Sequence, residues 1–248
     1  MRFTSLTSSD GVTEQFFTLD DVPGVLWTPQ AAGPSPLILL GHGGGQHKTA
    51  PGVVARARRY AAAGFAVVAI DAPNHGDRPK DEEFGRIAAG LRGGGDPGAL
   101  VAAMHAHLAG QAVAEWRAVL TAVRRLDEVG DGPAGYCGLS MGCGLGIPLI
   151  AAEPRIGAAV LGLLGADGLA GEAAQVKVPV RFLLQWDDRL VPRERGLALF
   201  DALGTSDKTL HANPGGHGDV PAFEVDDEAR FFARHLARSR ANGSSAKR

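Results

Sequence analysis

The sequence has few cysteines, no long apolar run and no excess of basic side chains. Its 248 residues include only 2 cysteines, which are too few for the disulfide framework of a small secreted domain. Residues Met1 to Ser5 lack the apolar segment of a signal peptide, and no stretch of about 18 apolar residues could cross a membrane. We therefore expect a soluble, cytoplasmic protein in which Cys137 and Cys143 are small buried fillers of the core.

Positive and negative charges are nearly balanced. The chain has 25 Lys and Arg against 27 Asp and Glu, which gives a net charge of −2. Proteins that bind nucleic acids usually carry a basic excess, so this balance argues against a nucleic-acid partner. A hydrophobic content of 45% supplies a sizeable core, and a chain of this length fits one α/β domain. We expect that domain to span residues 1–240, followed by a disordered tail at 241–248.

Continuous apolar runs alternate with helical patterns along most of the chain. The runs at 37–40 and 65–70 are typical of strands that are buried on both faces of a sheet. Antiparallel strands are predicted before them, at 12–19 and 22–27. Further strands are predicted at 134–137, 156–164, 178–185 and 208–211, and helices at 51–63, 111–129, 143–152, 194–203 and 222–239. This order predicts an α/β fold with a mostly parallel central sheet flanked by helices.

The segment Gly138-Leu139-Ser140-Met141-Gly142 lies between a predicted strand and a helix of small residues. A serine between two glycines at such a turn is typical of a nucleophile elbow. Side chains at positions 138 and 142 would collide with the neighbouring strand and helix, and the strained turn exposes the serine hydroxyl. The N-terminus of the following helix favours developing negative charge there. Ser140 is therefore a candidate nucleophile.

Three other predicted strands also end in residues that can carry chemistry. Glycines 43–45 follow the first buried strand, two adjacent aspartates follow position 186, and His217 follows the last strand. The carboxyl ends of parallel strands lie along one edge of a sheet, so these segments should meet. Serine needs a base to act as a nucleophile, histidine can take and return the proton, and a carboxylate orients the imidazole. This combination of residues predicts acyl transfer.

Four ordered motifs resemble those of the α/β-hydrolase superfamily, and within it the dienelactone-hydrolase and carboxylesterase-type members. They are His-Gly-Gly-Gly at 42–45, Asp-Ala-Pro-Asn-His-Gly at 71–76, Asp-Arg-Leu-Val-Pro at 188–192 and Gly-His-Gly at 216–218. The resemblance extends over roughly residues 20–238 in the order of its motifs. It implies an α/β-hydrolase fold and an esterase activity on a small molecule, with no metal or organic cofactor.

The resemblance also assigns roles to individual residues. It implies a catalytic triad of Ser140, Asp188 and His217. It implies an oxyanion hole formed by the backbone N–H groups of Met141 and Gly44, with the flanking glycines 43 and 45 left as alternatives.

Other carboxylates remain alternatives for the triad acid. Asp187 neighbours Asp188, but adjacent residues at an extended strand end point to opposite sides, so only one of them can reach His217. Asp167 follows an earlier strand, where some hydrolases carry the acid. Asp219 is a further candidate.

The other histidines have weaker claims to the role of base than His217. Among the 8 histidines, we expect His42 to brace the oxyanion segment and His75 to pack beneath the nucleophile. His105 and His107 would point to different faces of a helix, which disfavours a metal site. Three have no supporting motif: His47, His211 and His235.

Residues 77–110 form a long connection before the next predicted helix. Apolar residues recur at helical spacing on both sides of the glycines at 93–95, which predicts two short helices hinged at those glycines. These apolar residues are Phe84, Ile87, Leu91, Leu100, Val101, Met104 and Leu108. We expect the two helices to form a partial lid that lines the acyl pocket beside Ser140.

The sequence as a whole predicts a serine hydrolase that cleaves a small to medium carboxylic ester or lactone through an acyl-enzyme. An acyl thioester is the main alternative substrate. A peptidase or amidase, and a non-catalytic ligand-binding protein of the same fold, are weaker alternatives. A P-loop for nucleotides is disfavoured, because His47 stands where that motif needs a glycine before Lys48.

Overall fold

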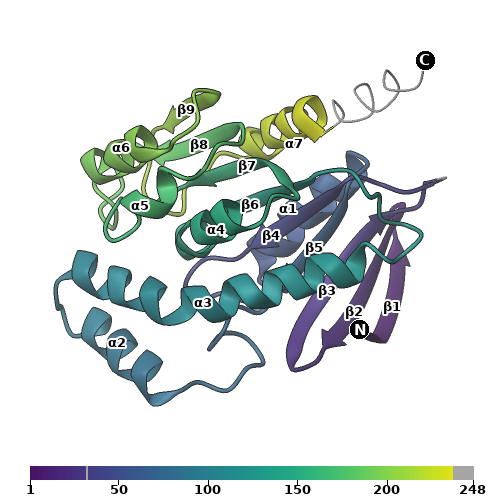
Figure 1. Ribbon diagram of the computed structural model, residues 1–248, viewed down its shortest axis with the longest axis horizontal. Coiled ribbons are helices and arrows are strands. Elements are labelled where there is room, and N and C mark those ends of the chain that lie inside the picture. Colours follow the sequence, from purple (N-terminus) through teal and green to yellow (C-terminus); the bar gives the residue numbers. More distant parts are fainter. Residues whose placement is uncertain (32, 237–248) are drawn as a thin grey trace.

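The computed structural model describes residues 1–31 and 33–236. Its centre is a 9-stranded sheet with the strand order β1-β2-β3-β5-β4-β6-β7-β8-β9 (Figure 1). The strands are β1 Arg2–Ser9, β2 Val12–Leu19, β3 Val22–Pro29, β4 Leu37–Gly41, β5 Ala66–Ile70, β6 Ala134–Leu139, β7 Ile156–Gly162, β8 Val180–Gln185 and β9 Lys208–Asn213. Strands β1 to β3 pair antiparallel, and β3 also pairs antiparallel with β5. All pairs from β5 to β9 are parallel, so the predicted mostly parallel sheet is confirmed.

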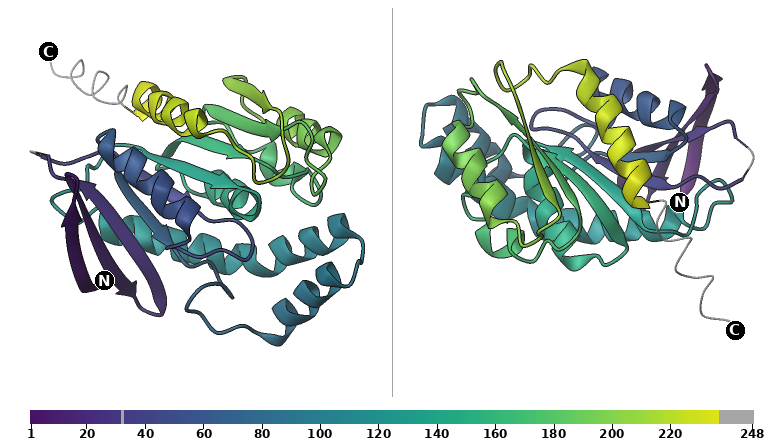
Figure 2. Two further views of the ribbon diagram at one scale, coloured as in Figure 1. Left: turned by 180° about the vertical axis from the view of Figure 1, so that it is seen from behind. Right: turned by 90° about the horizontal axis from the view of Figure 1, so that it is seen from above.

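Helices cover both faces of this sheet (Figure 2). They are α1 Pro51–Ala62, α2 Glu82–Arg92, α3 Pro97–Val123, α4 Met141–Ala152, α5 Ala170–Ala173, α6 Arg193–Ala202 and α7 Ala222–Leu236. Helices α1 and α7 pack on one face, where Tyr60 and Phe232 are fully buried. Helices α3 to α6 contribute to the core on the other face.

Strand β4 is buried on both faces of the sheet, which explains why apolar and polar residues do not alternate in its sequence. Leu37 and Leu39 belong to the core on one face of the sheet, and Ile38 and Leu40 belong to the core on the other. Both sides of the strand are therefore apolar, as expected for a central parallel strand. The two cysteines, Cys137 on β6 and Cys143 on α4, are free and buried, which confirms their predicted place in the core.

The largest departure from the predicted elements is helix α3. The sequence pattern predicted a short helix before position 110 and a separate helix at 111–129, but one helix of 27 residues runs from Pro97 to Val123. Its start is fixed by Asp96, whose carboxylate accepts the backbone N–H of Gly98. Gly110 does not interrupt it, because a single glycine costs only about 1 kcal/mol in a helix interior. The C-terminal helix is described to Leu236, so the predicted residues 237–239 and the predicted tail at 241–248 lie outside the described residues.

Helix α2 packs beside the N-terminal half of α3 and forms a hairpin with it, which we call the α2/α3 hairpin (residues 82–108). The hairpin extends away from the sheet at the lower left of Figure 1. Asp81 caps α2 by accepting the N–H of Phe84. The hairpin also packs against α4 through Met141 and Leu145. Two helices meeting at glycines 93–95 are thus present, although the second is longer than predicted.

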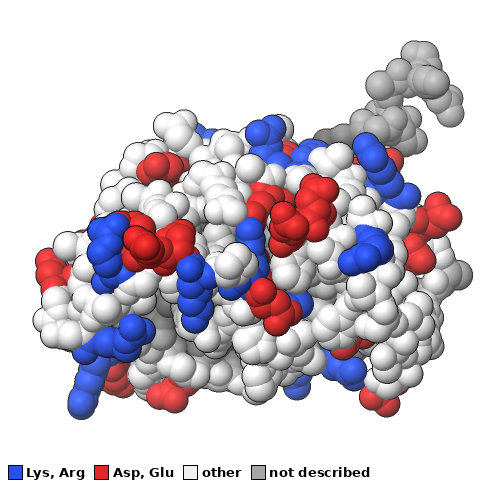
Figure 3. Space-filling view, turned by 90° about the horizontal axis from the view of Figure 1, so that it is seen from below, with Lys and Arg blue, Asp and Glu red and all other residues white. Residues whose placement is uncertain are grey.

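No helix within the described ranges is both long and apolar enough to cross a membrane. On the face that includes the hairpin, acidic and basic side chains are interspersed (Figure 3).

Candidate active site

Ser140 lies at the sharp turn between β6 and α4. Its backbone has φ +56° and ψ −123°, a conformation that non-glycine residues rarely adopt. A Cβ at Gly138 would collide with the carbonyl oxygen of Gly142, and a Cβ at Gly142 would lie 2.9 Å from the carbonyl oxygen of Gly41. Glycine is therefore required on both sides of Ser140, as the elbow motif predicted.

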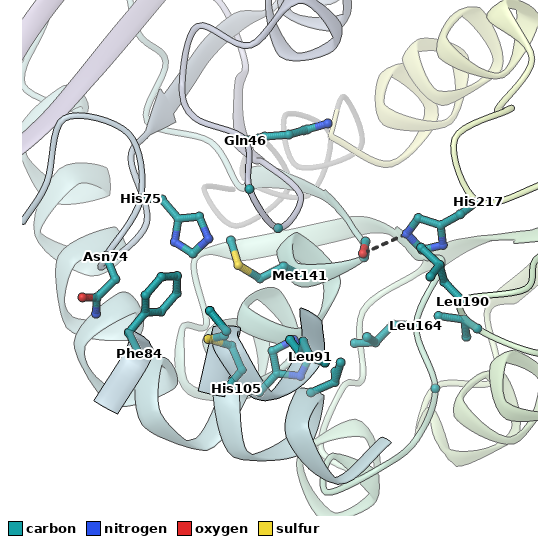
Figure 4. Close-up of a pocket in the computed structure, with 18 of the residues that line it drawn as sticks. Gln46, Asn74, His75, Phe84, Leu91, His105, Met141, Leu164, Leu190 and His217 are labelled. Carbon is teal, nitrogen blue, oxygen red and sulfur yellow. Dashed lines mark hydrogen bonds between the residues drawn. The ribbon is translucent and has the colours of Figure 1, made fainter. Parts of the chain in front are cut away.

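Ser140, His217 and Asp188 form one hydrogen-bonded chain. His217 Nε2 lies 3.0 Å from Ser140 Oγ, and His217 Nδ1 lies 2.6 Å from Asp188 Oδ2; Figure 4 draws the bond at His217. The other carboxylate oxygen of Asp188 accepts the backbone N–H groups of Leu190 and Val191 at 2.8 and 3.0 Å. The side chain of Asp188 is only 2% exposed, so this carboxylate is held in a fixed orientation behind the imidazole.

The other candidate acids lie elsewhere. Asp187 Oδ2 accepts the N–H of Gly215 at 3.1 Å and thereby ties the strand end to the loop of His217. Asp167 forms an ion pair with Arg195 at 3.7 Å. Asp219 accepts the N–H of Gly216 at 2.7 Å. None of these three carboxylates is hydrogen-bonded to His217 in the described structure.

The glycines that follow β4 face the first residue of α4. A Cβ at Gly44 would lie 3.9 Å from Cβ of Met141, an ordinary van der Waals contact, so the two residues are neighbours beside Ser140. The N–H of Gly43 is engaged by the side chain of Gln46 at 3.2 Å, which makes it a poor candidate for a substrate oxygen. Gly44 and Gly45 both line the cavity beside Ser140.

His42 braces this glycine segment, as the sequence predicted. Its Nε2 accepts the N–H of Ala72 at 3.0 Å, so its Nδ1 carries the proton and donates to the carbonyl of Gly43 at 2.9 Å. Burial lowers the pKa of His42 to about 4, so the ring is neutral at pH 7. The ring of His75 lies 5.3 Å from that of His42, between centroids, and burial also lowers its pKa.

A buried ion pair links the end of the glycine segment to the turn after β5. Lys48 Nζ donates to Asp71 Oδ2 at 2.8 Å and to Asp77 Oδ2 at 2.5 Å. Asp71 also accepts the backbone N–H groups of Lys48 and Asp77. Burial acts to lower the pKa of Lys48, but the hydrogen bonds to both aspartates outweigh it and raise that pKa. Burial acts to raise the pKa of Asp71, but its bonds to Lys48 outweigh it and lower that pKa. No sequence motif indicated this pair.

A cavity of about 730 Å³ opens beside Ser140 and His217, between the strand ends and the α2/α3 hairpin (Figure 4). Its lining includes four of the seven apolar residues that the sequence singled out, which are Phe84, Leu91, Val101 and Met104. It also includes His105 of α3, Met141 of α4, and the loop residues Leu164 and Leu190. Ile87, Leu100 and Leu108 are not among the lining residues and instead pack within the hairpin. The charged side chains on the lining are Lys80, Arg92, Asp167 and Arg195.

The two histidines near the middle of α3 point in different directions, as expected. His105 lines the cavity and is buried, whereas Nε2 of His107 lies 2.9 Å from a carboxylate oxygen of Asp81. Within the described residues, no three His, Cys, Asp or Glu side chains are grouped so that they could hold a metal ion.

Comparison with known proteins identifies the family of this chain. It is 37% identical to a cold-adapted esterase from an Arctic intertidal metagenomic library, solved bound to PEG, over 95% of this chain and 100% of that one, with a TM-score of 0.79. The chain belongs to the α/β-hydrolase superfamily. The solved relatives include esterases, and this likeness supports ester hydrolysis as the type of reaction.

Two more distant structures show the same fold. An acetyl xylan esterase from Paenibacillus sp. R4 is 16% identical, over 94% of this chain and 88% of that one, with a TM-score of 0.69. Est1E from Butyrivibrio proteoclasticus, solved with ferulic acid, is 16% identical, over 90% of this chain and 99% of that one, with a TM-score of 0.67. No protein-family model matches the chain, and no curated protein matches it.

Proposed function

We propose that the protein is a serine hydrolase that cleaves a small to medium carboxylic ester or lactone through an acyl-enzyme on Ser140. The observation that carries this proposal is the hydrogen-bonded chain from Ser140 Oγ through His217 to the buried Asp188, at 3.0 and 2.6 Å. The 37% identity to an esterase supports an ester as the scissile group.

In the first half of the reaction, Ser140 Oγ attacks the carbonyl carbon while His217 Nε2 takes the serine proton. The carbonyl electron pair moves to oxygen and gives a tetrahedral oxyanion. When this intermediate collapses, the bond to the alcohol breaks and the leaving oxygen takes the proton from His217. Asp188 stays ionised and stabilises the imidazolium from the Nδ1 side.

In the second half, water attacks the acyl-enzyme and His217 takes its proton. The Ser140 ester bond breaks, the proton returns to Oγ, and the carboxylic acid is released.

The oxyanion is proposed to accept hydrogen bonds from the backbone N–H groups of Gly44 and Met141. Both residues line the cavity with Ser140, and Met141 is the first residue of α4, where the helix dipole favours negative charge. Removing one such donor typically costs about 3–4 kcal/mol of transition-state stabilisation.

The α2/α3 hairpin is proposed to act as a partial lid over the substrate. Apolar side chains from both of its helices, including Phe84, Leu91 and Met104, line the cavity next to the nucleophile. A cavity of about 730 Å³ with such walls suits a substrate of small or medium size.

The test is an activity panel of acyl esters, lactones and acyl thioesters with Ser140→Ala as the blank. We expect ester or lactone turnover by the wild type, a kcat loss of roughly 10⁴-fold or more in Ser140→Ala, and an unchanged fold by circular dichroism. A fluorophosphonate should label Ser140 and no other serine. A preference for thioesters over esters would reassign the substrate class, and undiminished activity in Ser140→Ala would refute the mechanism.

A further inference from the structure

One polar side chain interrupts the apolar wall that α3 presents to the cavity. His105 lines the cavity next to Met104 and Val101, and its residue is only 4% exposed. Figure 4 shows His105 on the side of the cavity that carries Phe84 and Leu91, across Met141 from Gln46. His105 therefore forms part of the wall around the space that the non-reacting part of a substrate would occupy.

The hydrogen-bonding capacity of His105 is unused in the described structure. Its Nδ1 is buried without a hydrogen-bond partner, and no described residue bonds to its Nε2 either. Burial lowers the pKa of His105 to about 4, so at pH 7 the imidazole is neutral and carries one N–H and one lone pair. Buried polar groups are nearly always paired in folded proteins, which makes an unpaired imidazole on a cavity wall a place where a ligand group fits.

The absence of a side chain at one position of α4 leaves room for the ring of His105. Gly144 lies one turn after Ser140, and a Cβ at that position would overlap the Cε1–Nε2 edge of His105. Any other residue at 144 would push the imidazole away, so the glycine and the histidine are matched. The ring is thereby held against the helix that begins at the nucleophile.

We propose that His105 is a specificity-determining residue that forms a hydrogen bond with a neutral hydroxyl group on the otherwise apolar part of an ester substrate. This inference rests on the proposed ester hydrolysis at Ser140. A hydroxyl fits because it can accept from the N–H of a neutral imidazole or donate to its lone pair, whichever tautomer is present.

A carboxylate or an ammonium group fits this position less well than a hydroxyl. A neutral imidazole offers neither of them an opposite charge, and burying an unpaired charge among apolar side chains is costly. The cationic side chains Lys80 and Arg92 on the cavity lining are exposed to solvent, unlike His105.

The experiment compares matched substrates by pH-stat. Methyl hexanoate is measured against its 2-, 3- and 6-hydroxy derivatives, and hexyl acetate against 3- and 6-hydroxyhexyl acetate, which separates a hydroxyl on the acyl part from one on the alcohol part. For each pair, the ratio of kcat/KM with and without the hydroxyl is recorded. In the wild type we expect this ratio to be about 10-fold higher at one position than at the others, because one hydrogen bond compensates for the lost hydration of the hydroxyl.

Three variants assign this preference to His105. In His105→Phe the ratios should become equal within about 2-fold, because an aromatic ring is still present but it cannot form the hydrogen bond. In His105→Gln part of the preference should return, because the amide restores a donor and an acceptor. In the control His107→Phe, on the same helix but paired with Asp81 outside the cavity lining, the ratios should match those of the wild type.

The outcomes separate this inference from the proposed function. Equal ratios at all positions in a wild-type enzyme that hydrolyses the unsubstituted esters would overturn the role of His105 and leave the ester hydrolase intact. A folded His105→Phe variant whose ratios all equal those of the wild type would also overturn it. So would a folded His105→Gln variant whose ratios all equal those of His105→Phe. No turnover of any ester by the wild type would refute the proposed function itself.

Discussion

Replacing Lys48 by methionine should destabilise the protein strongly, although Lys48 is not hydrogen-bonded to the proposed triad. The side chain of Lys48 is 6% exposed and that of its partner Asp71 is fully buried. Removing one member of a buried ion pair typically costs 3–5 kcal/mol, because the other charge is left without compensation. Asp71 keeps two backbone N–H donors, from positions 48 and 77. We therefore expect the lower end of that range, about 3 kcal/mol.

The assay is urea unfolding at pH 7 together with thermal melting. For a chain of this size each 1 kcal/mol shifts Tm by roughly 2–4 °C, so Lys48→Met should melt about 6–12 °C lower than the wild type. Asp77→Asn is the matched control, since Asp77 bonds the same lysine with a side chain that is 76% exposed. The Asp77→Asn substitution should lower the free energy of unfolding by less than about 1 kcal/mol, as is usual for an exposed ion pair.

The pH dependence provides a second test of the same pair. Asp71 has a lowered pKa in the folded protein, so its contribution to stability is present above the usual aspartate pKa and is lost as the pH falls through the lowered value. Lys48 has a raised pKa, so its contribution is present below the usual lysine pKa and is lost as the pH rises through the raised value. The gap between wild type and Lys48→Met should therefore be widest near neutral pH and shrink in acid. A Lys48→Met variant no less stable than Asp77→Asn would refute this reasoning.

Three further predictions concern the site and the hairpin. Asp188→Asn should lower kcat by about 10⁴-fold and Asp187→Asn by less than tenfold, because only Asp188 is bonded to His217; a larger loss at position 187, in steady-state kinetics at matched stability, would reverse the assignment. Gly138→Ala should cost about 1–3 kcal/mol in urea unfolding, because the added methyl collides with the backbone of α4, and a wild-type midpoint would contradict this. Replacing residues 88–99 by a short Gly/Ser linker should alter kcat/KM across acetyl to octanoyl esters more than it alters acetyl ester turnover, because residues of that segment line the cavity; an unaltered chain-length profile in a folded variant would show that the hairpin is not a lid.

The central strands could be predicted from the sequence because burial on both faces leaves a continuous apolar run. Leu37 to Leu40 alternate between the two cores and give a local signal that needs no knowledge of their neighbours. Strand β1 left no such signal. Every residue from Arg2 to Ser9 is exposed, so the strand is defined by its backbone pairing with β2 and not by an apolar pattern.

Some residues of the candidate site could likewise be predicted from the sequence, and others could not. Ser140 and the loop of His217 could be singled out because glycines mark the tight backbone around them, and the structure brings both side chains together with Asp188. The pair of Lys48 and Asp71 could not, since it joins residues that are 23 positions apart and leaves no local pattern. The unpaired state of His105 likewise depends on the packing of α3 against Gly144, which only the folded chain defines.

The two buried thiols on either side of Ser140 allow local unfolding of the protein to be measured by chemical labelling. Burial raises the pKa of Cys137 and that of Cys143 to about 12, and a thiol reacts as its thiolate. A maleimide or disulfide reagent should therefore leave the native enzyme unmodified and fully active. It should label Cys137 only when β6 opens and Cys143 only when α4 opens, so the two labelling rates measure how often the strand and the helix on either side of Ser140 come apart.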